Sequence, residues 1–128
     1  MPTVTALYAG IIGLMAIAVA FPAGSLRGKL NIPIGDGGNR ELIRAMRRQA
    51  NFLEWAPLAL ILIGLLEMSG VGKIAIHVLG AGFVIARICH ALDFRADTMQ
   101  APGRAIGAAG SALVTVVASI WLIVRYFG

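Results

Sequence analysis

Two stretches decide the fold: residues 4–23, VTALYAGIIGLMAIAVAFPA, and residues 105–124, AIGAAGSALVTVVASIWLIV. Each runs for 20 residues without a charged side chain. A helix of that length, at about 1.5 Å per residue, matches the roughly 30 Å hydrocarbon core of a bilayer. Both stretches are therefore predicted to span a membrane. The first lacks the basic start and the cleavage site of a signal peptide, so we expect it to be retained.

The whole chain has the composition of a membrane protein. It contains 128 residues, of which 59% are hydrophobic and 13% charged, which suits one domain but not a soluble one. Two further apolar stretches, 51–68 and 74–92, are separated by the turn Ser-Gly-Val-Gly. We predict a single all-α domain over residues 1–128, an integral membrane four-helix bundle. Its helices are expected at about 4–24, 40–68, 73–93 and 104–126.

The connection from 24 to about 39 is predicted to be an ordered loop, because it contains Pro33 and the run Gly-Asp-Gly-Gly at 35–38. Asn39 is placed to cap the helix that follows. At the far end of that helix, we expect Glu67 to reach headgroups or water.

The net charge of +5 is distributed unevenly. Between the first two spans lie Arg27, Lys29, Arg40, Arg44, Arg47 and Arg48. Arg95 and Arg104 lie between the last two spans. By the positive-inside rule, these two connections face the cytoplasm and both termini face away from it. The basic residues thus indicate topology before any nucleic-acid partner, and we expect none.

Cysteine and histidine suggest neither a disulfide nor a metal site. Cys89 is the only cysteine, and the two histidines lie 13 positions apart without a pattern of carboxylates around them. We expect Cys89 to serve packing.

A line of polar residues interrupts the second apolar stretch. In RAMRRQANFLEWAP, residues 44–57, the polar side chains recur at steps of three and four and so share one helix face. They are Arg44, Arg47, Asn51 and Glu54. Such side chains are costly in a membrane unless they face protein or a wet cavity, which predicts a polar site near the cytoplasmic boundary. An equally open alternative is that Arg47 and Glu54 pair with neighbouring helices and set the helix register.

The third and fourth helices carry weaker signals. Arg87, His90 and Phe94 share one face of the third, where a single histidine is more often a structural donor than a catalyst. The fourth carries a small residue at every fourth position, which predicts a seam for close helix packing. These residues are Gly103, Gly107, Ser111, Thr115 and Ser119.

The pattern Arg-x-x-Arg-x-Gln-x-Asn-x-x-Glu-aromatic-x-Pro over residues 44–57 resembles the second-helix signature of the MAPEG family, membrane-associated proteins in eicosanoid and glutathione metabolism. The short chain and the Gly-Asp-Gly-Gly loop look most like bacterial members. The resemblance implies a homotrimer of four-helix subunits in a bacterial inner membrane, with glutathione bound between adjacent subunits and no metal. Burial of the polar line independently favours an oligomer, since one four-helix subunit has little interior.

The resemblance also implies roles for individual residues. It implies that glutathione is bound by Arg27, Arg44, Arg47, Gln49, Asn51, Glu54, Trp55, Arg87, His90 and Phe94. Glu54 would meet the ammonium group, and Arg27 would meet a carboxylate through the two-pronged guanidinium, unless Arg27 serves only topology. Trp55 stands where the family usually has tyrosine. His90 and Phe94 stand where leukotriene C synthase has two tyrosines, which puts polar contacts there in doubt.

Arg104 matches the family arginine that stabilises the thiolate, with a shift of a few residues in the preceding loop. A free thiol with a pKa of about 8.5 is mostly protonated at neutral pH, and a fixed cation beside it makes the sulfur nucleophilic. The implied function is a glutathione-dependent transferase or peroxidase acting on a lipophilic electrophile or hydroperoxide.

Two other functions stay open. One is a non-catalytic membrane scaffold or binding module of the same fold, which the missing tyrosines favour. The other is a small transporter or channel, suggested only by charge within the membrane. The sequence shows no repeated half or pair of broken helices, so the transporter is the weakest of the three.

Overall fold

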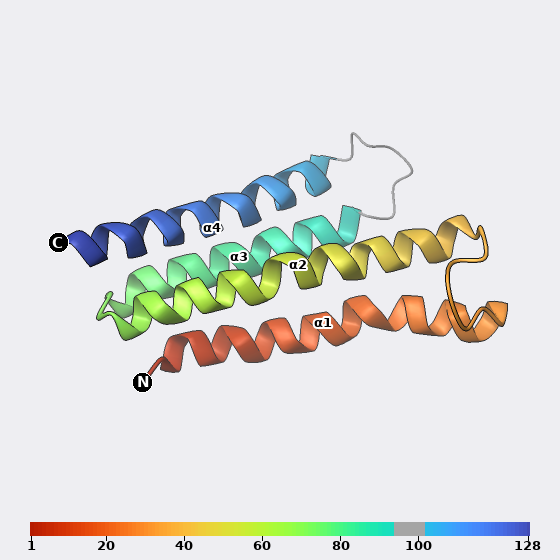
Figure 1. The fold of residues 1–128 in the computed structure, drawn as a ribbon, viewed down its shortest axis with the longest axis horizontal. Helices are drawn as coiled ribbons and strands as arrows, with labels where there is room; N and C mark the ends of the chain where they lie inside the picture. The colour runs from red at the N-terminus through yellow and green to blue at the C-terminus, as the bar shows by residue number, and fades with distance from the viewer. Residues whose placement is uncertain (94–101) are drawn as a thin grey trace.

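Four long helices make up the described part of the chain, which in the computed structural model comprises residues 1–93 and 102–128. They are α1 (Thr3–Leu30), α2 (Arg40–Met68), α3 (Lys73–Asp93) and α4 (Pro102–Phe127). Figure 1 shows them side by side, with both termini at one end and the α1–α2 connection at the other. Each is long and apolar enough to cross a membrane. The prediction of an all-α four-helix protein with four membrane spans is confirmed at this level.

Helices α2 and α3 each contact all three other helices. The most extensive contacts join α3 to α4 and α1 to α2, and α2 also packs against α3 and α4. Helix α1 contacts α3 but, within the described residues, not α4. In Figure 1, α2 and α3 accordingly lie between α1 and α4. Side chains on different faces of α2 can therefore belong to different sites.

Helix α1 is longer than the sequence predicts. It continues through residues 24–30 and ends at Asn31, which has a left-handed φ of 52° and whose N–H donates to the carbonyl of Arg27. The two glycines in this stretch each cost only about 1 kcal/mol in a helix, so they do not end it. Proline and the positive-φ glycines 35, 37 and 38 come later and form the connection at 31–39.

Side chains cap three of the four helix starts. Asn39 accepts a hydrogen bond from the Leu42 N–H at 2.9 Å, which confirms its predicted role as a cap of α2. Asp93, the last residue of α3, accepts from the Gly103 N–H in the first turn of α4. This bond ties the end of α3 to the start of α4.

The third cap gives Glu67 a role that the sequence does not predict. Its carboxylate accepts hydrogen bonds from the Val4 N–H at 2.9 Å, the Thr5 N–H at 2.7 Å and the Thr5 hydroxyl at 2.7 Å. A carboxylate at a helix start satisfies N–H groups that have no partner within the helix and complements the helix dipole. Glu67 therefore joins the end of α2 to the start of α1, while its side chain stays partly exposed at this end of the bundle.

The predicted seam on α4 is confirmed at Gly107. A Cβ at that position would lie 2.5 Å from the Ala86 carbonyl oxygen and 2.6 Å from the His90 backbone nitrogen. One turn along, Ser111 is fully buried. Only a residue without a side chain lets the backbones of α3 and α4 approach this closely.

The apolar interior fills the bundle only part of the way. One cluster of buried residues gathers near the chain termini and includes Tyr8, Leu66 and Ile76. A second follows it and includes Phe52 and Phe83. Next to Phe52 the interior holds a charged group, since the guanidinium of Arg87 lies 5.5 Å from the centre of the Phe52 ring.

Replacing Gly107 by alanine tests the α3–α4 contact. The added methyl would meet backbone atoms that cannot rotate away, so we expect Gly107→Ala to cost about 1–3 kcal/mol of stability. Thermal unfolding in detergent measures the loss. Gly13→Ala is the matched control, since nothing lies within 4 Å of its Cβ position, and it should not lower the melting temperature. Equal behaviour of the two variants would contradict the packing described here.

The Glu67 cap is tested by Glu67→Ala, which leaves two N–H groups of α1 without their acceptor. We expect a loss of about 1 kcal/mol, as for other helix caps, seen as a lower melting temperature in detergent. Glu67→Gln retains one acceptor oxygen and should lose less. If Glu67→Ala melted like the unaltered protein, the cap would contribute nothing.

Candidate functional site

The polar line of α2 faces a cavity at the end of the bundle near the α1–α2 connection. This polar cavity has a volume of about 520 Å³, within the range usual for small-molecule sites. It is lined by Ile43, Arg44, Arg47, Ala50, Asn51, Glu54, His90, Arg104, Ala105 and Ala108. The structure thus brings together six of the predicted site residues, from α2, α3 and α4.

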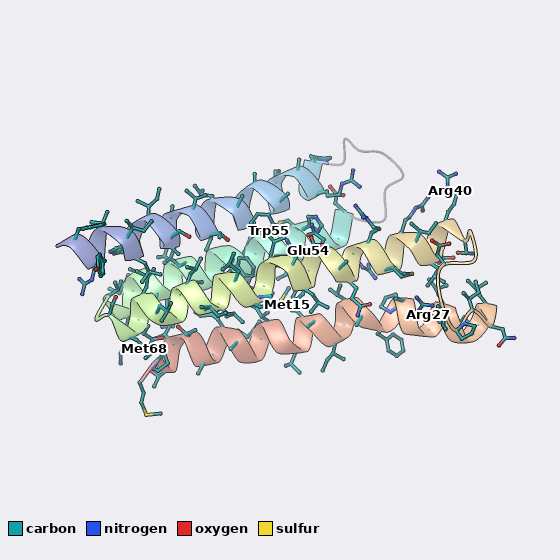
Figure 2. All side chains as sticks on the ribbon, in the orientation of Figure 1. Met15, Arg27, Arg40, Glu54, Trp55 and Met68 are labelled. Atoms are coloured by element: carbon teal, nitrogen blue, oxygen red, sulfur yellow. The ribbon has the colours of Figure 1, made fainter. Side chains whose placement is uncertain are left out.

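The cavity lies at the end of the bundle that the charge distribution of the sequence predicts to face the cytoplasm. Glu54 precedes the end of α2 at Met68 by 14 residues, or about 21 Å along the helix axis. If the roughly 30 Å hydrocarbon core begins at the Met68 end of α2, the Glu54 carboxylate lies inside the core and Arg44 lies near its edge. Figure 2 shows Glu54 near the middle of α2, while Arg40 lies at one end and Met68 at the other. Yet the Glu54 side chain is exposed in the single chain, which lipid cannot tolerate.

Arg87 lies behind this cavity and not in its lining. Its side chain is 1% exposed and is the largest of the fully buried side chains. It donates to Asn51 Oδ1 at 2.7 Å and to Ser111 Oγ at 3.2 Å, and its Nη2 lies 3.3 Å from His90 Nδ1. We call these four residues the Arg87 cluster. Through it one guanidinium joins α2, α3 and α4.

The Arg87 cluster also determines the form of His90. A guanidinium can only donate, so the Nδ1 that faces it acts as the acceptor. The ring proton of the neutral imidazole then resides on Nε2. His90 is 3% exposed and lines the polar cavity.

The cavity lining carries an excess of positive charge. Arg44, Arg47 and Arg104 contribute three positive charges and Glu54 one negative charge, which leaves a net charge of +2. Small apolar side chains complete the lining, from Ala50, Ala105 and Ala108. The lining therefore suits an anion that also carries one cationic group.

Two predicted site residues line a different pocket. The α1–α2 pocket has a volume of about 580 Å³ and is lined by Ala20, Ala23, Gly24, Arg27, Met46, Gln49, Ala50 and Leu53. Arg27 and Gln49 are thus separated within one chain from the residues of the polar cavity. Arg27 donates to the carbonyls of Ile32 at 3.2 Å and Pro33 at 3.4 Å, which hold the α1–α2 connection against α1. Figure 2 shows Arg27 at this end of the bundle.

The two aromatic residues of the predicted site lie elsewhere. Trp55 is partly buried and packs against the apolar cluster that contains Phe52 and Phe83. It lines neither the polar cavity nor the α1–α2 pocket. Phe94 lies outside the described residues.

Sequence reasoning missed the part that Ser111 plays. Its place in the small-residue stripe pointed to packing, and the hydroxyl does donate to the Gly107 carbonyl in its own helix at 2.8 Å. The same hydroxyl accepts from Arg87 on α3. No spacing links residues 87 and 111, so the only signal was a hydroxyl on the face of α4 that packs against α3.

Comparison with known proteins shows which family the chain matches. Residues 5–124 match the model of the MAPEG family. The chain is 30% identical over 119 residues to the inner membrane protein YecN of Escherichia coli K12, covering 92% of this chain and 91% of that protein. YecN of Escherichia coli O6:H1 matches with the same identity and coverage. No solved structure shows a significant match.

Proposed function

The chain belongs to the MAPEG family, and we propose that it is a membrane enzyme that binds glutathione and activates its thiolate. The acceptor is a lipophilic electrophile, to which the thiolate is conjugated, or a hydroperoxide, which it reduces. The observation that carries this proposal is the polar cavity, where charged and amide side chains from three helices converge at the membrane boundary.

The charge of the cavity complements that of the ligand. Glutathione carries two carboxylates and one ammonium group, and its thiolate form has a net charge of −2. The lining carries three arginines and one glutamate, a net charge of +2. Complementary charge favours the thiolate over the thiol, because the neutral sulfur would leave one positive charge of the site without a counterpart.

Each polar group of the ligand has a partner in this arrangement. Glu54 meets the ammonium group, while Arg44 and Arg47 meet carboxylates in the two-pronged geometry of guanidinium. Asn51 contributes an amide hydrogen bond. His90 lines the cavity at the position where leukotriene C synthase has a tyrosine.

Arg104 stabilises the sulfur. It enters the cavity from the first turn of α4, opposite the polar line of α2. A fixed guanidinium beside the sulfur stabilises the thiolate, which is the nucleophilic form, so no covalent nucleophile of the protein is required. The thiolate then attacks an electrophile that arrives from the lipid.

The site is completed by a second copy of the chain. An exposed carboxylate at the depth of Glu54 needs protein and not lipid as its neighbour. The α1–α2 pocket offers Arg27 and Gln49 on another side of the same helix. In the proposed homotrimer, this pocket of one subunit faces the polar cavity of the next, so that both sets of residues contact one glutathione.

The proposed location is a bacterial inner membrane, as in the name of the Escherichia coli relative. The basic α1–α2 connection faces the cytoplasm and the termini face away from it. Within this membrane, residues 1–128 act as one transmembrane domain.

A non-catalytic binding module is the second candidate. It is favoured by the engagement of His90 with Arg87 and by the absence of the two tyrosines that leukotriene C synthase has at the positions of His90 and Phe94. This candidate predicts glutathione binding without a thiolate signal and without turnover.

Thiolate formation is the direct test of the proposed enzyme. Titration of the detergent-purified protein with glutathione should give a saturable increase in thiolate absorbance in the ultraviolet. Arg104→Ala should lose this signal, because the sulfur then lacks its cation. Arg40→Ala is the control, since Arg40 is an exposed arginine at the same end of α2 that does not line the cavity. Binding by calorimetry without any thiolate signal would favour the non-catalytic module.

Mixed oligomers test whether two subunits share one site. Arg27→Ala and Glu54→Gln should each abolish most glutathione binding when expressed alone. Co-expression should restore a fraction of the binding sites, because an interface with an intact pocket from one subunit and an intact cavity from the other then forms. Calorimetry on the doubly tagged, co-purified oligomer measures that fraction. No recovery would mean that each site is built within one chain.

A further inference from the structure

We propose that Arg87 sets the direction of the Asn51 amide, so that at this position the site offers only an N–H donor and selects a carboxylate or carbonyl group of its ligand. Arg87 is thus a positioning residue that acts through Asn51. The identity of the ligand rests on the proposed function, but the orientation of the amide rests on the Arg87 cluster alone.

The first step is the chemistry of the contact. An asparagine amide presents an acceptor oxygen and a donor nitrogen, while a guanidinium has donors and no acceptor. The bond of 2.7 Å from Arg87 Nη2 therefore requires the oxygen of Asn51 to face Arg87. The reversed amide would place N–H groups against N–H groups and a partial positive charge against a cation.

The second step is the rigidity of Arg87. Its side chain is 1% exposed and lies against the ring of Phe52, with Ser111 and His90 as further polar partners. Within the described residues these partners are all neutral, and Arg87 Nε is buried without any partner. A buried guanidinium in this situation depends on each acceptor it has, so the Asn51 oxygen cannot be released cheaply.

The third step concerns the other end of the amide. Asn51 is half-buried and lines the polar cavity. Its Nδ2 forms no hydrogen bond in the described part of the chain, whereas Oδ1 is taken by Arg87. The amide hydrogens are therefore the groups of Asn51 left for a ligand, and only an acceptor can bind them.

This arrangement extends the site beyond its lining. Ser111 on α4 supports Arg87 from the far side, and it can do so because the adjacent Gly107 lets α4 approach α3. Arg87 and Ser111 influence the ligand without lining the cavity. To contact the bound molecule directly, Arg87 would have to break its contacts with Asn51, Ser111 and His90.

The substitution Asn51→Asp keeps the shape of the side chain and removes its N–H donor, so it tests the orientation of the amide. Aspartate keeps an acceptor for Arg87, supplies the anion that the buried guanidinium lacks, and removes the donor from the cavity. We expect the melting temperature of the ligand-free protein to be unchanged or higher, and the Kd for glutathione to rise about tenfold or more. A lower melting temperature would overturn the proposed contact, because an unpaired carboxylate would then have been buried.

A double-mutant cycle tests whether Arg87 acts through Asn51. Arg87→Lys keeps the charge but loses the fork of donors, so it should weaken glutathione binding in the otherwise unaltered chain. In the Asn51→Ala background the same change should have no further effect. Ser111→Ala, a milder change, should show the same pattern even if Arg87→Lys unfolds. Additive effects of both substitutions would overturn the inference.

Separate measurements test the proposed function and the orientation of the Asn51 amide. If the unaltered protein bound no glutathione in calorimetry, the proposed function would fall. The melting temperature of ligand-free Asn51→Asp would still decide the orientation of the amide, since that measurement requires no ligand. If glutathione bound normally to both the unaltered protein and Asn51→Asp, the proposed function would stand and the inference about the donor would be wrong.

Discussion

The burial of a guanidinium within a membrane bundle is the constraint on which the arrangement of three helices depends. A charged group in this setting is tolerated only with hydrogen-bond partners around it. Arg87 finds them on α2, on α4 and on its own helix, and a ring face at Phe52. To satisfy one side chain, α2 must present Asn51 inward and α4 must approach closely enough to present Ser111. The small residues of α4 follow from this requirement.

That constraint divides the polar residues into two layers. The Arg87 cluster is a buried support, and the residues in front of it line an open cavity. Asn51 belongs to both layers, with its oxygen toward Arg87 and its amide N–H groups toward the cavity. A site built in this way has its hydrogen-bonding directions decided before any ligand arrives, which reduces the ordering that binding must impose.

Helix α2 carries a second requirement on another face. Residues two positions apart, such as Gln49 and Asn51, point in different directions around a helix, and they line separate cavities here. Within one chain, Gln49 and Asn51 therefore do not line the same cavity. The shared site proposed above would place the exposed Glu54 of one copy near the Arg27 pocket of another.

The sequence by itself determined the four spans, the Asn39 cap and the common face of Arg44, Arg47, Asn51 and Glu54, because apolar length and helical periodicity are local properties. The same local rules misplaced the end of α1, since nothing but the capping geometry at Asn31 showed where the chain leaves the helix. Only the tertiary structure decided that Glu67 caps α1, that Gln49 and Arg27 line a pocket apart from the polar cavity, and that Arg87 lies behind Asn51 instead of in the lining. Each of these depends on the rotation of one helix against another, and that rotation is set by packing and by the partners of buried polar groups, which no spacing within one helix records.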